Sequence, residues 1–547
     1  MKKHALSILL VIVLSYWSIK PLTSPGYFPM HDDTQVGRVV AMGRALRAGQ
    51  FPVRWVSDLG YGYGYPLFNF YGPLPYYVGG FFYLLGFSGL VATKLMFGLG
   101  IILAGITMYI FLANILASRV AALVGSLFYL YAPYHAVQIY VRGAVGEFWI
   151  LVFLPLIFLG LWKRSALIGG LGLAGAILSH TLLGYATTVF LIVGLIGYWL
   201  IRAIARKLTF SLLISHFSLL FIGLGLSAFF WLPAMGEMRF TAVGGQIGPT
   251  ANFRDHFVCP SQLWNSLWGF GGSIPGCVDG ISFKLGKLHL LMALLTLGAW
   301  FLKPQIRKVL NWPLLFGVTV TQGAIFFTLP VSVSLWNIMP WAAYIQYPWR
   351  FLTFAIFGLA ILVGSGVMIF AKKIWRWLAV AALVSGVIFL NAKWFRPQYQ
   401  YLKPAAEFES IEELRFRVSR ISDEYLPPLL PRPSDVSGIV RQVVEARGDL
   451  RVSNVWDNGV VARFIVDSPK EQEIKLRRAY FPGWHYWLNG REIKPQVTSG
   501  IPSFGVPSGE SIIDIQFRNT PIRLVGNLAS VATLIILVLI YDKKAIS

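Results

Sequence analysis

Apolar runs long enough to cross a lipid bilayer recur along the whole chain, and no other feature of the sequence constrains the fold as strongly. A helix needs about 20 predominantly apolar residues to cross the hydrocarbon core. Of the 547 residues, 56% are hydrophobic and only 13% are charged, which is more apolar surface than a soluble globule of this length is expected to carry. The pattern therefore predicts a helical protein that crosses a membrane many times.

Short basic connectors orient these apolar runs. The formal charge of +23 comes from residues scattered in pairs beside apolar runs rather than gathered on one polar face, so we attribute it to membrane orientation and not to nucleic-acid binding. Cytoplasmic loops collect Lys and Arg. The connectors that we place in the cytoplasm are Lys2–Lys3, Arg119, Lys163–Arg164, Arg202 with Arg206 and Lys207, Lys303 with Arg307 and Lys308, Lys372–Lys373, and Lys543–Lys544.

With these connectors inside, we expect about twelve spans in the plasma membrane and both termini in the cytoplasm. The first run stays a span rather than a cleaved signal peptide, because Tyr16, Trp17 and Lys20 stand where a cleavage site needs small residues. Two shorter apolar segments, 73–87 and 331–348, are expected to be interfacial or re-entrant. The spans cover 4–20, 91–113, 119–134, 148–162, 165–181, 185–201, 209–233, 286–302, 310–330, 350–371, 374–391 and 523–541.

Three long segments, 21–90, 234–285 and 392–522, then lie outside the cytoplasm. The expected domains are a multi-helix transmembrane domain over 1–391 that carries the first two as outer loops, a mostly β extracytoplasmic domain over 392–522, and a transmembrane anchor with a cytoplasmic tail over 523–547. Asn458-Gly459 and Asn489-Gly490 predict hairpins of a small β-sandwich. Cys259 and Cys277 share the second outer loop, where an oxidising compartment favours a disulfide over two free thiols.

The start of the first outer loop is the most informative stretch for chemistry. His31-Asp32-Asp33 places two adjacent carboxylates just beyond a span, where they are costly unless they face water, a cation or a partner. Asp32 also has Gln35 three residues later, which suits a helix capping box. One carboxylate can cap while the other faces a cavity, and the sequence does not say which.

Basic and aromatic residues of the same loop are candidates to bind a lipid phosphate or another part of a substrate. Arg38 lies opposite the apolar face of the helix expected after Asp33, as in a helix at the membrane interface. Arg38 and Arg54 suit forked hydrogen bonds to phosphate, and ordinary attraction to anionic headgroups is the alternative. Tyr63 and Tyr71 lie in a stretch rich in glycine, proline and tyrosine that ends at Tyr77.

Five further groups lie at ends of spans on the expected outer side. They are His135, Arg142, Glu147, His180 and Arg350. Arg142 and Glu147 also suit a structural ion pair, but all five converge on the surface where a shared cavity would lie. No zinc-protease motif, phosphate-binding loop or dinucleotide-binding glycine pattern occurs in a suitable context. Nucleotide-driven chemistry is therefore not expected, no cofactor is indicated, and a divalent metal stays open.

These residues resemble a family of bacterial and archaeal membrane proteins labelled 6-pyruvoyl-tetrahydropterin synthase-related. The resemblance rests on His31-Asp32-Asp33, Gly62 to Tyr77, Arg142 to Glu147, Ser179-His180, Tyr347 to Arg350, Asp423 to Pro427 and Pro482-Gly483-Trp484 with Asn489-Gly490. It covers nearly the whole chain and implies an architecture rather than a reaction. True pterin synthases are soluble zinc enzymes with a histidine cluster, which this sequence lacks.

A more distant resemblance is to the glycosyltransferase C superfamily, which shares a first span, a long outer loop with an acidic residue near its start, and often a terminal outer domain. It implies a glycosyltransferase C-like fold and an inverting transfer, with Asp32 or Asp33 as base or as ligand of acceptor or metal. We therefore expect sugar transfer from a polyprenyl-phosphate donor to a glycan, lipid or protein acceptor, with Arg142, Arg350 or a first-loop arginine at the phosphate.

Two other functions compete with this expectation. A non-catalytic membrane scaffold or polysaccharide-assembly factor would depend on 392–522 and not on the aspartates. A transporter would need ionisable residues at mid-membrane and usually repeated halves, and neither is clear in this sequence.

Overall fold

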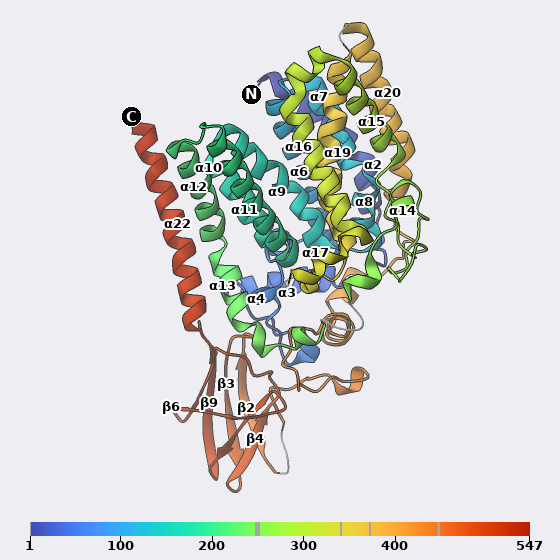
Figure 1. The fold of residues 1–547 in the computed structure, drawn as a ribbon. Coiled ribbons are helices and arrows are strands. Elements are labelled where there is room, and N and C mark those ends of the chain that lie inside the picture. The colour runs from blue at the N-terminus through green and yellow to red at the C-terminus, as the bar shows by residue number, and fades with distance from the viewer. Residues whose placement is uncertain (1, 247–251, 340–341, 371–372, 446–448, 547) are drawn as a thin grey trace. The chain divides into compact units, whose positions relative to one another are not determined.

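The computed structural model describes residues 2–246, 252–339, 342–370, 373–445 and 449–546 (Figure 1). Lys372, one of the expected cytoplasmic residues, lies outside these ranges. The chain forms two compact units, each assembled from stretches that are far apart in the sequence. Unit 1 comprises Met1–Asp32, Lys94–Gly225 and Ile247–Leu402, and unit 2 comprises Asp33–Thr93, Leu226–Gln246 and Lys403–Ser547.

Among the described residues, eight helical segments are long and apolar enough to cross a membrane. Two more qualify if each of two bent helix pairs counts as one span, and two apolar helices are shorter. Each expected span coincides with one of these segments. The eight span-length segments are His4–Thr23, Gly89–Ile115, Val145–Lys163, Thr181–Ile204, Leu310–Thr328, Pro348–Ile369, Ile374–Trp394 and Pro521–Ile540. The two bent pairs are Arg119–Leu130 with Pro133–Val141 and Phe210–Leu226 with Ala228–Phe240. The two shorter apolar helices are Ala166–Ser179 and Lys287–Leu302.

The helices of unit 1 pack closely because small residues line their contacts. A Cβ atom on Gly160 of α9 would lie 2.2 Å from the backbone nitrogen of Gly169 on α10, so only glycine permits this approach. The helices are α1 (Lys2–Leu14), α2 (Tyr16–Ile19), α6 (Gly89–Ile115, which begins in unit 2), α7 (Arg119–Leu130), α8 (Pro133–Ala136), α9 (Val145–Lys163), α10 (Ala166–Ser179), α11 (Thr181–Ile204), α12 (Phe210–Leu226), α14 (Pro260–Trp264), α15 (Lys287–Leu302), α16 (Pro304–Thr328), α19 (Leu352–Gly366) and α20 (Lys373–Asn391).

The two short apolar segments form helices too short to cross a membrane. Segment 73–87 contains α5 (Leu74–Leu84), and segment 331–348 contains α17 (Val333–Ile338) and α18 (Ala342–Ile345). In the latter, the Trp336 ring stacks on Phe253 with centroids 5.1 Å apart and meets Phe351 at 5.8 Å. These contacts place the segment in an aromatic cluster of unit 1.

The helical part of unit 2 is held by a buried ion pair. The helices are α3 (Gln35–Arg47), α4 (Leu67–Phe70), α5, α13 (Ala228–Glu237), α21 (Ser419–Ile421) and α22 (Pro521–Ile546). Arg523 of α22 is 0% exposed and its Nη2 lies 2.9 Å from Glu237 Oε2 on α13. Glu237 also accepts a hydrogen bond of 2.8 Å from Asn69, so three distant stretches meet at one carboxylate.

The C-terminal strands form a β-sandwich, as expected. One sheet has the order β1-β4-β8-β7 and the other β2-β3-β9-β5-β6, all pairs antiparallel. Tyr486 of one sheet meets Phe504 of the other with ring centroids 6.4 Å apart. The strands are β1 (Val444–Glu445), β2 (Arg451–Asp457), β3 (Val461–Ser468), β4 (Gln472–Leu476), β5 (Trp484–Leu488), β6 (Arg491–Ile493), β7 (Gln496–Thr498), β8 (Ile501–Val506) and β9 (Gly509–Phe517).

Both expected hairpins are confirmed. β2 pairs with β3 around Asn458-Gly459, and β5 pairs with β6 around Asn489-Gly490. Asn489 and Gly490 have φ of 50° and 80°, the positive values that a two-residue hairpin turn requires.

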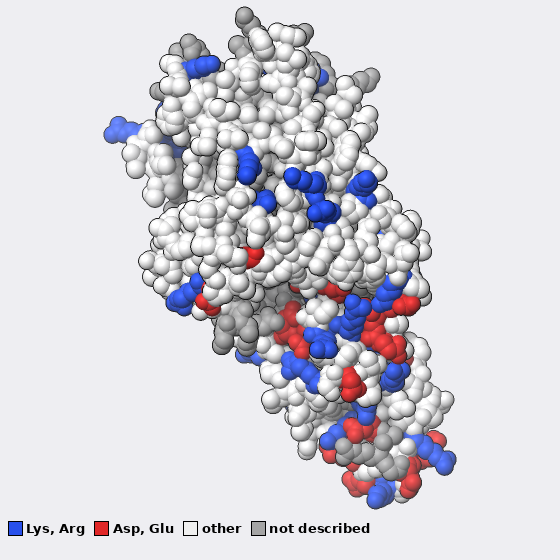
Figure 2. All heavy atoms as spheres, turned by 90° about the vertical axis from the view of Figure 1, so that its right-hand side faces the viewer, with Lys and Arg blue, Asp and Glu red and all other residues white. Residues whose placement is uncertain are grey.

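On the face shown in Figure 2, charged side chains are sparse over the helices and frequent over the β domain, as expected for helices that face lipid.

Candidate functional site

In unit 1, the N-terminal ends of three helices bring ionisable side chains to one place. Glu147 lies in the first turn of α9, and His180 is the N-cap of α11, its Nδ1 accepting a hydrogen bond of 3.1 Å from the Leu183 backbone. Arg350 lies in the 3-10 turn η8 (Pro348–Phe351), which leads into α19. Helix N-termini carry unpaired backbone N–H groups and partial positive charge, so this arrangement favours an anion.

Glu147 is the centre of the cluster. It is 1% exposed, and both terminal nitrogens of Arg142 donate to its carboxylate, Nη2 to Oε1 at 2.8 Å. Arg350 Nε lies 3.0 Å from Oε1 and makes an ion pair without hydrogen-bond alignment, and His180 Nε2 lies 3.9 Å from the same oxygen. Two guanidinium groups therefore meet at one carboxylate.

Aromatic rings hold both guanidinium groups in position. Arg142 lies over the Trp349 ring at 4.3 Å, and Arg350 lies over the Tyr347 ring at 5.0 Å. The Tyr347 and Trp349 rings stack on each other with centroids 4.9 Å apart. Flat stacking suits the guanidinium plane and restricts its rotation.

His31 and Asp32 join this cluster through their backbones. The Asp32 nitrogen donates to the Arg142 carbonyl at 3.0 Å, and the His31 nitrogen donates to the Val141 carbonyl at 3.0 Å. Asp32 also interacts electrostatically with Arg142, and His31 Nε2 lies 3.0 Å from the Phe270 carbonyl. Unit 1 therefore brings together Asp32 and four of the five span-end residues selected from the sequence.

Asp33 belongs to unit 2 and has different neighbours. Its carboxylate lies 3.6 Å from Arg417 Nη2, with Glu413 and Lys403 nearby. Burial raises the pKa of Asp33 to about 6, and Arg417 offsets only part of this effect.

The expected capping box at Asp32 is wrong. Helix α3 begins at Gln35, its N-cap is Thr34, and the Thr34 side chain makes no capping hydrogen bond. The reason is that the Asp32 backbone is already bound to that of Arg142, so the helix starts two residues too late for Asp32 to serve as its cap.

The two candidate arginines of the first loop are buried among protein partners. Arg38 is 4% exposed, donates to Ser422 Oγ at 2.8 Å and lies over the Tyr71 ring at 4.2 Å. It does not lie on an exposed interfacial face as we expected, because these polar groups from distant parts of unit 2 surround it. Arg54 donates to Asn69 at 3.0 Å and to Asn527 at 2.8 Å.

His135 lies in an apolar environment. It is 0% exposed, its Nδ1 lies 3.1 Å from the Leu130 carbonyl, and its ring packs near Phe148 and Phe395.

Tyr63 lies in the loop Gly60–Gly64, which we call the glycine loop. The Tyr61 carbonyl accepts from Val440 at 2.9 Å and the Tyr63 carbonyl accepts from Ala479 at 2.8 Å. Gly62 and Gly64 have φ of 87° and 85°. The sequence motif that we associated with substrate therefore also binds the backbone of the C-terminal part of unit 2, a contact that no local pattern indicates.

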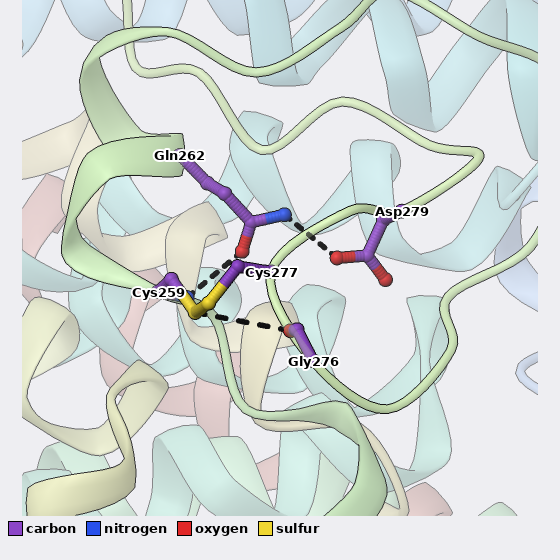
Figure 3. Close-up of a disulfide and its surroundings, with 5 residues drawn as sticks. All are labelled: Cys259, Gln262, Gly276, Cys277 and Asp279. Carbon is purple, nitrogen blue, oxygen red and sulfur yellow. Dashed lines mark hydrogen bonds between the residues drawn. A yellow bond between two sulfur atoms is a disulfide. The ribbon is translucent and has the colours of Figure 1, made fainter.

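Cys259 and Cys277 form a disulfide in unit 1 (Figure 3), with Cα atoms 5.5 Å apart and a sequence separation of 18. Gln262 supports the loop that the disulfide closes. Its Oε1 accepts from the Cys259 nitrogen at 2.8 Å and its Nε2 donates to Asp279 at 2.7 Å.

Among the described residues, no group of three or more His, Cys, Asp or Glu side chains is arranged to hold a metal ion.

The span-length helices and the two C-terminal sheets define a polytopic α-helical membrane protein with a β-sandwich domain. No protein-family model matches the chain, and no curated protein matches it. Among solved structures, the chain is similar to that of ArnT from Cupriavidus metallidurans bound to undecaprenyl phosphate, with 14% identity, a TM-score of 0.38 and 70% of this chain covered. The chain spans 63% of the length of that protein. The resemblance to the 6-pyruvoyl-tetrahydropterin synthase-related family stays a prediction.

Proposed function

We propose that this membrane protein transfers a sugar from a polyprenyl-phosphate donor to an acceptor outside the cytoplasm, and that both chain termini are cytoplasmic. The observation that carries the proposal is the backbone hydrogen bond from Asp32 to Arg142, which holds a carboxylate beside the Arg142–Glu147–Arg350 cluster. Such a transfer needs a general base and positive charge for a departing phosphate. Both kinds of group occur in unit 1.

In the proposed step, Asp32 accepts the proton of the acceptor hydroxyl while the hydroxyl oxygen attacks the anomeric carbon of the donor sugar. The new carbon–oxygen bond forms as the bond between the anomeric carbon and the phosphate oxygen breaks. Its electron pair leaves with polyprenyl phosphate, and the configuration inverts. Arg142 and Arg350 offset the negative charge that develops on the leaving phosphate.

Glu147 is a positioning residue in this proposal. Its carboxylate fixes the orientation of the Arg142 and Arg350 guanidinium groups, whose remaining N–H bonds are needed for the phosphate. The rings of Trp349 and Tyr347 stack on these two guanidinium groups and restrict their rotation. A preorganised charge of this kind needs no rearrangement when the phosphate leaves.

Asp33 is the second candidate base. A pKa near 6 suits a base that works close to neutral pH, because the group is ionised there yet still takes up a proton. Its neighbours Arg417 and Lys403 supply positive charge in unit 2. Separate substitution of the two aspartates decides between them.

The test uses the full chain in lipid vesicles with a panel of radiolabelled polyprenyl-phosphate hexoses, and it measures transfer of label out of the lipid fraction. We expect Asp32→Asn to lower the rate by about 100-fold or more, the usual contribution of a general base. The control is Glu510→Gln, which removes an exposed carboxylate from β9. Unchanged turnover in the double variant Asp32→Asn with Asp33→Asn would remove the proposed role of both aspartates.

A further inference from the structure

We propose that unit 2 contains a second ligand site, a pocket that binds an oxyanion such as a phosphate or a carboxylate through Arg415, Arg477 and Arg478. The pocket lies between the glycine loop and the segments around Val440 and Arg478. All of its lining residues belong to unit 2, whereas the Asp32 cluster belongs to unit 1.

The wall of this pocket is built by close backbone contact. A Cβ atom on Gly62 would lie 2.7 Å from the Val440 carbonyl oxygen and 2.8 Å from Arg415 Cδ, and the φ of Gly62 is positive. Glycine is therefore required for the loop to approach the arginines this closely. The hydrogen bonds from Val440 and Ala479 to the carbonyls of the glycine loop also hold this wall in place.

Arg478 supplies a buried donor without a protein partner. It is 5% exposed, its guanidinium lies over the Trp484 ring at 4.6 Å, and its Nη2 donates to Asp457. Among the described residues, its Nη1 is buried and has no hydrogen-bond partner. Leaving a charged N–H group buried and unpaired is costly, so an acceptor at this place would remove the penalty.

Arg415, a second lining residue, repeats this arrangement. Its Nη1 donates to the Val440 carbonyl, while its Nε is buried and lacks a partner within the described part of the chain. The pocket thus contains two guanidinium groups that are each anchored at one nitrogen and unsatisfied at another. Guanidinium forks match the paired oxygens of phosphate and carboxylate groups.

Positive charge dominates the pocket. Four arginines line it against a single aspartate, Asp457. Arg441 is paired with Glu412 at 3.1 Å and Arg478 is paired with Asp457. Arg477 makes no ion pair in the part of the chain that the structure describes, and it interacts electrostatically with the hydroxyl group of Tyr63. A charge surplus next to unsatisfied donors is the chemistry that recognises an oxyanion rather than a neutral sugar.

The test measures binding of three small probes to the full-length protein in detergent by titration calorimetry. The probes are inorganic phosphate, glucuronate as a carboxylate sugar, and glucose as a neutral control. We expect saturable binding of phosphate, glucuronate or both, and none of glucose. The anion that binds identifies whether the group recognised is a phosphate or a carboxylate.

Two variants locate the binding in this pocket. Arg477→Ala is expected to weaken anion binding by about tenfold or more, the loss of one charge-assisted hydrogen bond, without unfolding the protein, because this arginine makes no ion pair in the described structure. Arg478→Lys keeps the positive charge but removes the forked pair of guanidinium N–H donors, so it is expected to weaken anion binding similarly. The matched control Arg463→Ala removes an exposed arginine from β3 and should leave the affinity unchanged.

Three results would overturn the proposal. They are the absence of binding by either anion, equal binding of glucose, and an equal effect of Arg463→Ala and Arg477→Ala, which would show only bulk charge. None of these measurements requires sugar transfer, so this proposal and the proposed function stand or fail separately.

Discussion

Arg142 donates from two nitrogens to the carboxylate of Glu147, and the pair is buried where α9 begins. Arg350 approaches the same carboxylate from the turn before α19. One acidic side chain therefore fixes two cations that come from parts of the chain about 200 residues apart.

Replacing Glu147 with Gln should destabilise unit 1 strongly. The substitution keeps the shape of the side chain but leaves two buried guanidinium groups without their counter-charge, which costs about 3 kcal/mol or more. We expect a clear fall in the apparent melting temperature of the protein in detergent. Asp514→Asn, which breaks the exposed Arg463–Asp514 pair on the β domain, should change it little. Equal melting temperatures for the two variants would contradict a central role of Glu147.

The Asp33→Asn variant should change how stability depends on pH. The pKa of Asp33 in the folded protein is about 6, above its ordinary value of 3.8, so between these values the folded state binds more protons at Asp33 than the unfolded state. The contribution of this group therefore falls as pH rises through that window, by on the order of 1–3 kcal/mol. Apparent melting temperatures measured from about pH 4 to 8 should show this fall in the wild type.

In Asp33→Asn, the same fall should be absent and the protein should be more stable than the wild type above about pH 6. Glu510→Gln, at an exposed position of β9, serves as the control and should retain the wild-type profile. Identical profiles for wild type and Asp33→Asn would show that Asp33 does not titrate in this window.

Gly62→Ala should destabilise unit 2, whether or not the pocket binds an anion. Alanine at a φ of 87° is strained, and its Cβ would meet the Val440 carbonyl oxygen, so we expect a loss of about 1–3 kcal/mol. The control Gly505→Ala replaces a glycine of β8 whose added Cβ would meet nothing within 4 Å. Thermal unfolding followed by tryptophan fluorescence compares the two. A Gly62→Ala protein as stable as Gly505→Ala would contradict the close contact of the glycine loop.

The disulfide gives a prediction about the compartment of the loop around Cys259. Protein from intact cells should react with a maleimide reagent only after reduction, and the double variant Cys259→Ser with Cys277→Ser should not react at all. The double variant should also be less stable by about 3 kcal/mol, because an open loop of this length has more freedom when unfolded. Labelling without reductant would place these thiols in a reducing environment.

The helical fold was predictable because the signal is local. A bilayer demands a long apolar run, and each expected span coincides with a span-length helix, a bent helix pair or a shorter apolar helix. The hairpins at Asn458-Gly459 and Asn489-Gly490 were predictable for the same reason, since two residues determine the turn.

The detailed environment of the site residues was less predictable. Asp32 and Asp33 are neighbours in sequence, yet one is bound to Arg142 in unit 1 and the other lies beside Arg417 in unit 2. The partner of Arg38 is Ser422, and a partner of Arg54 is Asn527. No periodicity within the first loop specifies contacts with residues that follow several hundred positions later.

The buried pair of Glu237 and Arg523 joins residues 286 positions apart, and the Tyr61 hydroxyl meets Asp423 after 362 positions. At translation rates of about 5–20 residues per second, the growing chain waits on the order of tens of seconds between the appearance of the two members of each contact. During that interval α13 presents an acidic group whose counter-ion has not been synthesised. A premature stop codon between positions 403 and 522 would make that state permanent, because unit 1 would be complete while Glu237 of unit 2 would never meet Arg523.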